Sequence, residues 1–578
     1  MLKRLASYLR GYERYAAASP LLVVAETLCE LVLPLLMARI INEGIEGNDM
    51  AVIWQSGGLM VLVAVLATAA GGAAARCAAY AAQGLGANLR RAEFEKIASF
   101  SFADIDRFSS SSLITRLTND LTNVQNVAVM CLRILIRGVT MTVASVILTL
   151  SLSPRLALVV CVVLPFMAAA LGLLMKICFP LFEKMQKALD HLNETVQENL
   201  IAVRVVKSYV RENHEREKFF DANNGFTAAG LQAVLRIVAV QPVMMICFAA
   251  ATVLVLYNGG NLVLSGGLNI GDLQAVTGYI MQILMSAMMI GMAVLQYTRA
   301  QASIRRVFEV LDAESAITGG GADRLPAPRG RVEFRDVSFR YQTDGAGEDV
   351  LKHINLTVEP GEFVAIVGGT GTGKSSLVNL IPRFYDVHRG QVLVDGLDVR
   401  DYPLDGLRGR IGMVLQNNVL FSGTIRENLL WGNENASEEE LAQAARDAQA
   451  YDFITSFPDG FDTSLEQGGV NVSGGQKQRL CIARAMVRKP AVLILDDSTS
   501  AVDSATEGRI RESFRENLKG TTVIIIAQRI SSVQYADKIV VLDEGTVSAV
   551  GTHSELMETS PIYREIYDSQ QEGGGDNG

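Results

Sequence analysis

Eight consecutive residues in the second half of the chain have the composition of a phosphate-binding loop. They are Gly368, Gly369, Thr370, Gly371, Thr372, Gly373, Lys374 and Ser375, and Ser376 follows them. Glycines at these spacings let backbone N–H groups converge on phosphate oxygens, while the lysine reaches the outer phosphates and the serine hydroxyl binds Mg²⁺. The pattern therefore predicts a site for the phosphates of a nucleotide together with magnesium.

The residues on either side of this loop have the secondary structure that such a site needs. Residues 363–367 are an apolar run that predicts a buried strand, and residues 376–380 predict the start of a helix. A helix N-terminus adds positive potential where phosphate would lie. The strand–loop–helix order turns a short pattern into a specific structural prediction.

Two further motifs follow the loop. One consists of Val472, Ser473, Gly474, Gly475 and Gln476, and the other ends a predicted strand with the adjacent carboxylates of Asp496 and Asp497. The three motifs in this order resemble the nucleotide-binding domain of an ATP-binding cassette (ABC) protein. We therefore expect ATP and Mg²⁺ as ligands.

The resemblance implies a role for each matching position. Asp496 would bind Mg²⁺ together with Ser375 and Gln416, and Gln416 would also connect the ATPase core to membrane helices. Tyr341 matches the aromatic residue that stacks on adenine, the alternative being an ordinary strand aromatic. Residues 472–476 match the signature loop, which caps the γ-phosphate of ATP bound to the opposite subunit. The family's loop for communication between facing ATPase domains matches Ser500, Ala501, Val502 and Asp503.

Two positions depart from the family pattern, and both belong to the hydrolysis step. Asp497 stands where the family has a glutamate that positions the attacking water, and Gln528 stands where it has a switch histidine. Loss of one methylene retracts the carboxylate by about 1.5 Å, and misplacement on that scale can cost ~100-fold in rate. We predict a site that binds ATP and hydrolyses it poorly. The alternative is tolerated drift in an enzyme that is merely slow.

Composition indicates a protein that lies partly in a membrane. Of 578 residues, 49% are hydrophobic and 20% are charged, and the mean hydropathy is +0.25. A membrane-spanning helix needs ~20 apolar residues, and six stretches reach this length. They are residues 18–41, 57–81, 130–152, 156–179, 237–263 and 273–295. These stretches exclude a soluble ATPase module.

Loop charges predict the orientation in the membrane. Residues 42–53 and 258–272 contain no Lys or Arg, whereas residues 82–129 and 180–236 are rich in both. The positive-inside rule then places both termini and both long loops in the cytoplasm. We expect a multi-pass protein of the cell membrane, with an amphipathic N-terminal helix at the cytoplasmic surface.

The two long loops have helical periodicity, so the membrane helices are expected to continue beyond the bilayer. Breaks near residues 101–104 and 199–202 would turn the chain back. Residues 108–120 and 203–209 resemble the coupling regions of ABC exporters. The alternative is that both are ordinary charged helices.

A glycine- and proline-rich segment divides the chain. We assign residues 312–330 to a domain linker on this composition. The expected fold is multidomain. An all-α transmembrane domain with six helices, similar to type I ABC exporters, would occupy residues 1–311, and an α/β phosphate-loop nucleotide-binding domain would occupy residues 331–570. Residues 571–578 would form a disordered tail.

Two carboxylates in the first apolar stretch are candidates for a transport path. Glu26 and Glu30 are four residues apart and share one helix face, and ionisable residues at membrane depth usually face the bundle interior. The alternative is a structural pair neutralised by Arg76, Arg133 or Arg137. A set of methionines could line a cavity for varied apolar ligands or be ordinary core and lipid-facing residues. They are Met244, Met245, Met281, Met285, Met288, Met289 and Met292.

The residues kept and lost favour one half of a heterodimeric, multidrug-type ABC exporter. Such a chain would hold ATP at its own degenerate site and lend its signature to a second half-transporter with intact catalytic Glu and His. It would move drugs, lipids or other amphipathic small molecules outward, in contact with membrane lipids. The net charge of -9 gives no reason to expect nucleic acid. The alternatives are a homodimeric exporter with two slow sites and an ATP-sensing membrane switch that does not transport.

Overall fold

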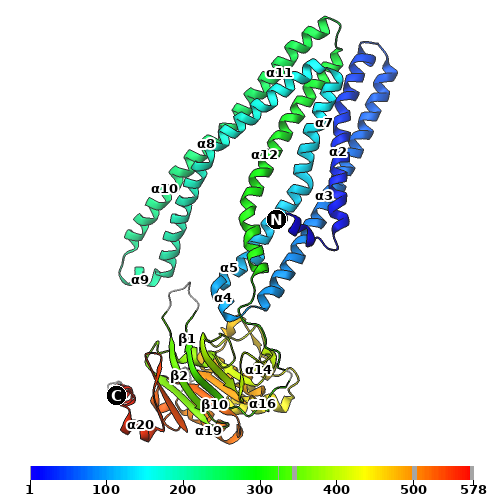
Figure 1. The fold of residues 1–578 in the computed structure, drawn as a ribbon. Helices are drawn as coiled ribbons and strands as arrows, with labels where there is room; N and C mark the ends of the chain where they lie inside the picture. Colours follow the sequence, from blue (N-terminus) through cyan, green and yellow to red (C-terminus); the bar gives the residue numbers. More distant parts are fainter. Residues whose placement is uncertain (1, 323, 342–347, 498–503, 573–578) are drawn as a thin grey trace. The chain divides into compact units, whose positions relative to one another are not determined.

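The computed structural model describes residues 2–322, 324–341, 348–497 and 504–572, which divide into two compact units (Figure 1). The first unit, Met1–Ile97 with Ser111–Ala313, is helical. The second, Ala98–Ser110 with Glu314–Gly578, contains the strands and is an α/β structure. A helical region followed by an α/β domain confirms the predicted fold class.

The helical unit is built from long helices with short π-helical segments between some of them. The helices are α1 (Leu2–Ser7), α2 (Glu13–Arg39), α3 (Met50–Ala98), α5 (Ser110–Thr115), α6 (Leu121–Val129), α7 (Ile136–Leu152), α8 (Pro154–Ile201), α9 (Val203–Ser208), α10 (Glu212–Val238), α11 (Val240–Leu264) and α12 (Ile270–Asp312). The π segments are η1 (Ile40–Ile45), η2 (Arg116–Asp120) and η3 (Met130–Leu135).

Within the described residues, five helical runs are long and apolar enough to cross a membrane. They are Glu13–Ile45, Met50–Ala98, Ser110–Leu152, Glu212–Leu264 and Ile270–Asp312. Each contains one of the predicted spans, and the remaining predicted span, residues 156–179, lies within α8. Helices α3 and α8 continue far past their apolar stretches, as the periodicity predicts, and α12 does so as well.

Helices α2, α7 and α12 pack together around an apolar cluster. Leu31, Met141 and Tyr279 are buried in this cluster, and Tyr279 is fully enclosed. A buried hydroxyl needs a partner, and the Tyr279 hydroxyl donates to the Leu31 carbonyl at 2.8 Å. This bond ties α12 to α2 in the middle of the apolar region.

The predicted break at residues 101–104 is confirmed, and the short helix after it belongs to the α/β unit. Ser101 caps helix α4 (Phe102–Phe108) through a capping box with Asp104. The Phe102 ring stacks on Phe384 at a centroid distance of 4.3 Å, and the Tyr385 hydroxyl donates to the Asp106 carboxylate at 2.7 Å. Helix α4 is therefore seated on the α/β fold by stacking and by a side-chain hydrogen bond.

The α/β unit contains two main sheets and a small two-stranded one. The antiparallel sheet has the order β2-β1-β4-β5 and consists of β1 (Val332–Phe339), β2 (Leu351–Val358), β4 (Arg389–Val394) and β5 (Leu397–Asp398). The larger sheet has the order β12-β11-β3-β10-β9-β6 and consists of β3 (Phe363–Gly368), β6 (Ile411–Val414), β9 (Val492–Asp496), β10 (Thr522–Ile526), β11 (Lys538–Asp543) and β12 (Thr546–Gly551). The small sheet pairs β7 (Gly423–Thr424) with β8 (Ser464–Leu465).

Helices cover the larger sheet. The helices that follow β3 in the α/β unit, only some of which contact this sheet directly, are α13 (Lys374–Asn379), α14 (Leu404–Arg408), α15 (Ile425–Leu430), α16 (Glu438–Asp447), α17 (Tyr451–Ser456), α18 (Gly474–Val487), α19 (Ser504–Asn517), α20 (His553–Thr559) and α21 (Pro561–Glu572). Helix α21 includes Gln571 and Glu572, which the sequence predicts to lie in a disordered tail. The last six residues lie outside the described part of the chain.

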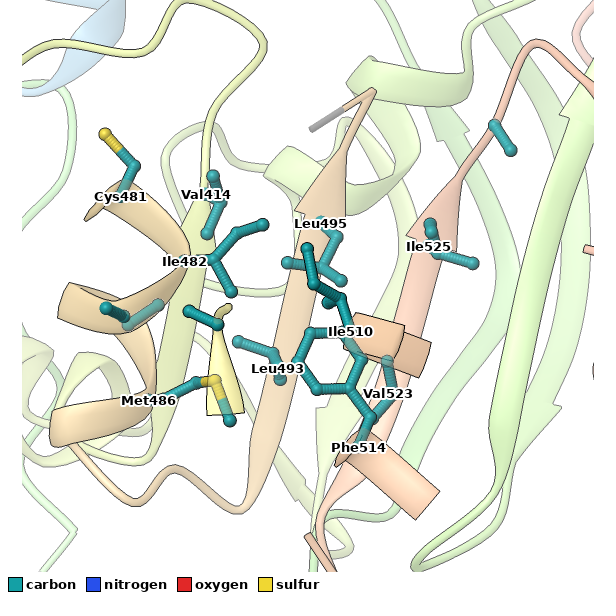
Figure 2. Close-up of a cluster of buried hydrophobic side chains, with 14 of the residues drawn as sticks. Val414, Cys481, Ile482, Met486, Leu493, Leu495, Ile510, Phe514, Val523 and Ile525 are labelled. Atoms are coloured by element: carbon teal, nitrogen blue, oxygen red, sulfur yellow. The ribbon is translucent and has the colours of Figure 1, made fainter. Parts of the chain in front are cut away.

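Strand β9 is buried on both faces because its side chains alternate between two cores. Leu493 and Leu495 lie in one core with side chains from α18 and α19, as Figure 2 shows, whereas Val492 and Ile494 lie in the other. Ile482 of α18 and Phe514 of α19 are among the residues that fill the first core. This packing fixes the strand whose last residue is Asp496.

Candidate nucleotide-binding site

Four neighbouring parallel strands end at one edge of the larger sheet, and the predicted site residues lie at these ends. The phosphate-binding loop follows β3, Gln528 follows β10, Asp496 ends β9 and Gln416 follows β6. Ligands of open α/β sheets bind outside the carboxyl ends of the strands. Residues that are far apart in the sequence are thus brought to one edge by strand order alone.

The phosphate-binding loop needs glycine at positions with left-handed backbone. Gly371 and Gly373 have φ values of +83° and +93°. A Cβ atom on Gly373 would lie 2.8 Å from Cδ2 of Leu351 and 3.1 Å from the Val350 carbonyl oxygen, and the left-handed backbone would strain any residue that has one. The local fold agrees with the sequence prediction of a strand, a glycine loop and a helix.

Lys374 is the cation of the loop. Its ammonium donates to the carbonyl oxygens of Gly368 at 3.0 Å and Gly369 at 2.6 Å. Burial lowers the pKa of Lys374 below its ordinary value of 10.5, although the carboxylates of Asp497 and Asp496 oppose that shift. A half-buried ammonium beside a glycine loop is suited to an anionic phosphate ligand.

Ser375 and Asp496 form the predicted magnesium pair. The Ser375 hydroxyl donates to Asp496 Oδ1 at 2.9 Å, and Asp496 is only 5% exposed. Burial raises the pKa of Asp496 above its ordinary value of 3.8, and the neighbouring Asp497 carboxylate adds to this effect. Since Mg²⁺ binds through one or two carboxylates and hydroxyl or phosphate oxygens, this donor set fits Mg²⁺ carried by ATP. When bound, the ion would neutralise a carboxylate that the fold holds in an unfavourable environment.

The two positions that depart from the family pattern contact each other. Gln528 Nε2 donates to Asp497 Oδ2 at 2.7 Å. Asp497 has a φ of +48°, a region in which aspartate is several-fold enriched over most residues. Burial raises the pKa of Asp497, while Lys374 and the Gln528 amide lower it. Sequence reasoning identified both residues but could not foresee their contact.

Tyr341 follows β1 and is 37% exposed, which leaves part of its ring open. Its hydroxyl lies 2.9 Å from the Ser376 hydroxyl, directly after the phosphate-binding loop. The ring of Tyr385 meets it edge-on at 5.1 Å, and Tyr385 in turn bonds Asp106 of α4. The adenine-stacking role of Tyr341 stays a prediction. No sequence signal distinguishes Tyr385 from the other aromatic residues of the chain.

The signature residues begin helix α18. The Ser473 hydroxyl accepts from the Gln476 N–H, and the Gln476 side chain accepts from the Ser473 N–H, which forms a capping box. Val472 packs against the core, whereas Gly474 is exposed. The predicted communication loop, residues 500–503, lies outside the described residues.

In the helical unit, Arg137 contacts both predicted carboxylates. Its guanidinium donates to Glu26 Oε1 at 2.6 Å and to Glu30 Oε1 at 2.7 Å. Glu26 is buried, with its carboxylate so close to Gly71 of α3 that a Cβ there would lie 2.6 Å from Oε1. Arg76 instead lies over the ring of Tyr80. The arrangement matches the structural alternative for the glutamate pair.

Methionines of α12 line a cavity next to this ion pair. The cavity has a volume of about 500 Å³, and its lining includes Met141, Met281, Met285, Met289 and Gln282. A second cavity of about 480 Å³ includes Glu30, Met37 and Met60 in its lining. Glu30 therefore belongs both to the ion pair and to a cavity wall.

The fold and the site define a membrane protein with an ATP-binding cassette, and comparisons with known proteins agree. Residues 17–288 match the family model of the ABC transporter transmembrane region, and residues 351–500 match the family model described as ABC transporter. The chain belongs to the ABC transporter family and has the half-transporter arrangement of an ABC exporter, with a membrane domain fused to one ATPase domain. It is a multi-pass, ATP-driven transporter, and ABC exporters function as dimers.

Relatives cover nearly the whole length of the chain. It is 40% identical over 571 residues to the uncharacterized ABC transporter ATP-binding protein YfiB of Bacillus subtilis, covering 98% of each chain. It is 33% identical to the putative multidrug export ATP-binding/permease protein YgaD of the same organism, covering 99% of each. A solved bacterial Atm1-family ABC exporter with ATP bound superposes with a TM-score of 0.80 at 25% identity, covering 97% of this chain and 98% of that one.

Proposed function

We propose that this chain is the degenerate-site subunit of a heterodimeric ABC exporter of the cell membrane. The observation that carries the proposal is the contact between Asp497 and Gln528 at 2.7 Å, beside a phosphate-binding loop and a Ser375–Asp496 pair that fit MgATP. The residues for binding ATP are kept, and the two positions for hydrolysing it are changed.

Both changes weaken hydrolysis for a physical reason. A general base must lie within hydrogen-bond reach of the attacking water. The Asp497 carboxylate is one methylene shorter than glutamate, and one of its oxygens accepts from the Gln528 amide. An amide has no titratable proton and cannot take the place of an imidazole in proton movement. The chain therefore keeps the residues that bind ATP, and bound ATP should stay at this site for a long time before it is hydrolysed.

The partner would be a second half-transporter with intact catalytic Glu and His. In this assembly Ser473, Gly474, Gly475 and Gln476 would close over ATP held by the partner, whose own signature would close over the site described above. This division accounts for an intact signature in a chain whose own hydrolytic positions are altered. It is the reason for preferring a heterodimer over a homodimer with two slow sites.

The proposed substrate is an amphipathic small molecule, such as a drug or a lipid, which is moved outward. The methionine-lined cavity beside Arg137 supports this class, because flexible thioethers adapt to varied apolar ligands. The similarity to YgaD, a putative multidrug export protein, points the same way. We further propose cytoplasmic termini, a transmembrane domain in residues 1–311 and an ATP-binding domain in residues 331–570.

The test begins with purification of the full chain from native membranes and identification of the co-purified protein by mass. We expect a similar half-transporter with Glu and His in the two changed positions. In the complex, Gly474→Glu places a negative charge against the partner's γ-phosphate and should abolish ATP turnover. Gly321→Glu is the matched control, because Gly321 is exposed and a Cβ added to it would lie in open space.

Two results would contradict the proposal. One is rapid ATP turnover by this chain in the absence of any partner. The other is full turnover of the complex carrying Gly474→Glu, which would mean that this signature does not serve the active site. Capture of the chain with only a second copy of itself would favour the homodimer.

A further inference from the structure

The last helix of the chain reaches back to the segment that carries Gln528. The side-chain amide of Gln570, on α21, donates from Nε2 to the backbone carbonyl of Gln528 at 2.7 Å. Its Oε1 accepts from the backbone N–H of Ile530 at 2.8 Å. One side chain thus pairs with the backbone on both sides of Arg529, as a neighbouring strand would do.

The apolar face of α21 holds Gln570 in this position. Tyr563 is fully buried, and Ile566 and Tyr567 pack against the same core, which also includes Ile525 of β10. Gln570 lies four residues after Ile566 and three after Tyr567, so it extends the anchored face by one turn. A rigid helix therefore presents the amide to the segment.

The segment is restrained from a second direction. The guanidinium of Arg511, on α19, donates to the backbone carbonyl of Ser532 at 2.9 Å. With both ends of residues 528–532 held, the Gln528 side chain leaves from a fixed backbone and reaches Asp497. Displacement of the backbone by the length of one hydrogen bond would remove that contact.

We propose that Gln570 is a positioning residue of the nucleotide site, fixing the backbone at Gln528 so that the Gln528 amide stays at Asp497 and beside the bound phosphates. The role of the site as a holder of ATP rests on the proposed function above. The contact itself makes helix α21 part of the ATP site, and loss of its clamp should shorten the time for which ATP is retained.

Three variants separate the possibilities. Gln570→Ala removes both hydrogen bonds. Gln570→Glu keeps an acceptor for the Ile530 N–H but loses the donor and places a negative charge against the Gln528 carbonyl. Gln571→Ala is the matched control, because the Gln571 amide donates to Tyr567 within the same helix at 3.3 Å.

The first measurement needs no nucleotide. Hydrogen–deuterium exchange of the peptide covering residues 528–532 is followed in the full-length complex in lipid nanodiscs. Gln570→Ala should speed exchange of the Ile530 amide by about three- to tenfold, the range for one lost net hydrogen bond, and Gln571→Ala should leave it unchanged. Equal exchange in Gln570→Ala and wild type would overturn the clamp, whatever the site does with ATP.

The second measurement is the rate at which radiolabelled MgATP leaves the same complex. Gln570→Ala and Gln570→Glu should release it about three- to tenfold faster than wild type. In a Gln528→Ala background, Gln570→Ala should add little, since residues that act through one another are not additive. Full additivity, or equal release by the alanine variants of Gln570 and Gln571, would overturn the positioning role. Absence of retained ATP in wild type, with the exchange difference present, would instead count against the proposed function.

Discussion

Two pairs of acidic side chains, one in each unit, differ in how their charge is met. Glu26 and Glu30 share Arg137, whose guanidinium donates to both carboxylates. Asp496 and Asp497 lie near Lys374, but its ammonium donates to the loop carbonyls of Gly368 and Gly369. Each pair has one cation of the chain for two carboxylates. Arg137 is hydrogen-bonded to both members of the first pair, which we call the complete pair, whereas Lys374 donates to backbone carbonyls beside the second, which we call the incomplete pair.

The difference separates carboxylates that stabilise the fold through a cation of the chain from carboxylates that are placed to bind a cation from a ligand. A buried carboxylate that is hydrogen-bonded to a cation of the chain becomes strongly destabilising when that cation is removed. Carboxylates whose pKa is raised by burial, as for Asp496 and Asp497, gain from a cation supplied by a ligand. Perturbed pairs of this second kind gather at functional sites.

The largest expected effect is on the complete pair. Arg137→Met should lower the free energy of unfolding by about 3 kcal/mol or more, because two carboxylates would remain in the apolar bundle without a cation. Denaturant unfolding of the purified complex measures this loss. The combined variant Glu26→Gln, Glu30→Gln and Arg137→Met should recover most of it, and equal instability of both variants would mean that Arg137 acts through packing alone.

Removal of the cation beside the incomplete pair should weaken ATP binding rather than lower the stability of the fold. Lys374→Ala should weaken ATP binding by about 10- to 100-fold, the cost of losing a charged hydrogen-bond donor to phosphate. The free energy of unfolding should change by less than about 1 kcal/mol. Equilibrium ATP binding and denaturant unfolding are compared with Lys352→Ala, a change at an exposed lysine of β2. Loss of stability without loss of binding would reverse the roles assigned to the two pairs.

Neutralising one carboxylate in each pair sharpens the comparison. Glu26→Gln should lower the free energy of unfolding by about 1 kcal/mol, the value of a typical hydrogen bond. Asp496→Asn should leave it unchanged or raise it, because a carboxyl whose folded pKa lies above 3.8 is destabilising when ionised at neutral pH. The Mg²⁺-dependent part of ATP binding should disappear in Asp496→Asn, as titration with and without Mg²⁺ would show. A stability loss of equal size in both variants would contradict the distinction.

The features that could be predicted from the sequence are those that depend on residues next to one another in the chain. The phosphate-binding loop, the strand that ends in Asp496 and the break before α4 each depend on a few neighbouring positions and on local geometry. The fold class followed from the same local patterns and from the apolar stretches. These predictions needed no knowledge of which elements pack together.

Contacts between distant elements could not be predicted in this way. Three arginines were candidates for the glutamate pair, and the choice of Arg137 depends on the rotation and depth of α7 relative to α2. Gln570 contacts Gln528 only because α21 packs on the same core as β10. The left-handed backbone of Asp497 is set by the end of a buried strand and has no sequence signature beyond the residue type.

The smallest effect is expected from restoring the family pattern in the incomplete pair. Asp497→Glu with Gln528→His would supply a longer carboxylate and an imidazole, yet we expect little change in turnover of the complex. Residue 497 has a φ of +48°, which aspartate tolerates better than glutamate. The heterodimer proposal also implies an altered signature in the partner, so closure over this site would remain incomplete.

The decisive measurement is the amount of ATP and ADP retained after turnover, in wild type and in the restored variant. ATP retained at about one site per dimer in both would support a tether that keeps the two ATPase domains engaged while the other site cycles. Such a tether stabilises the closed dimer in proportion to the difference in ATP affinity between the two states. Conversion of the retained ATP to ADP by the restored variant would locate the whole defect in Asp497 and Gln528. Equal loss of ATP from both sites of wild type would mean that the two substitutions are drift, and that the second acidic pair completes an ordinary, slow catalytic site.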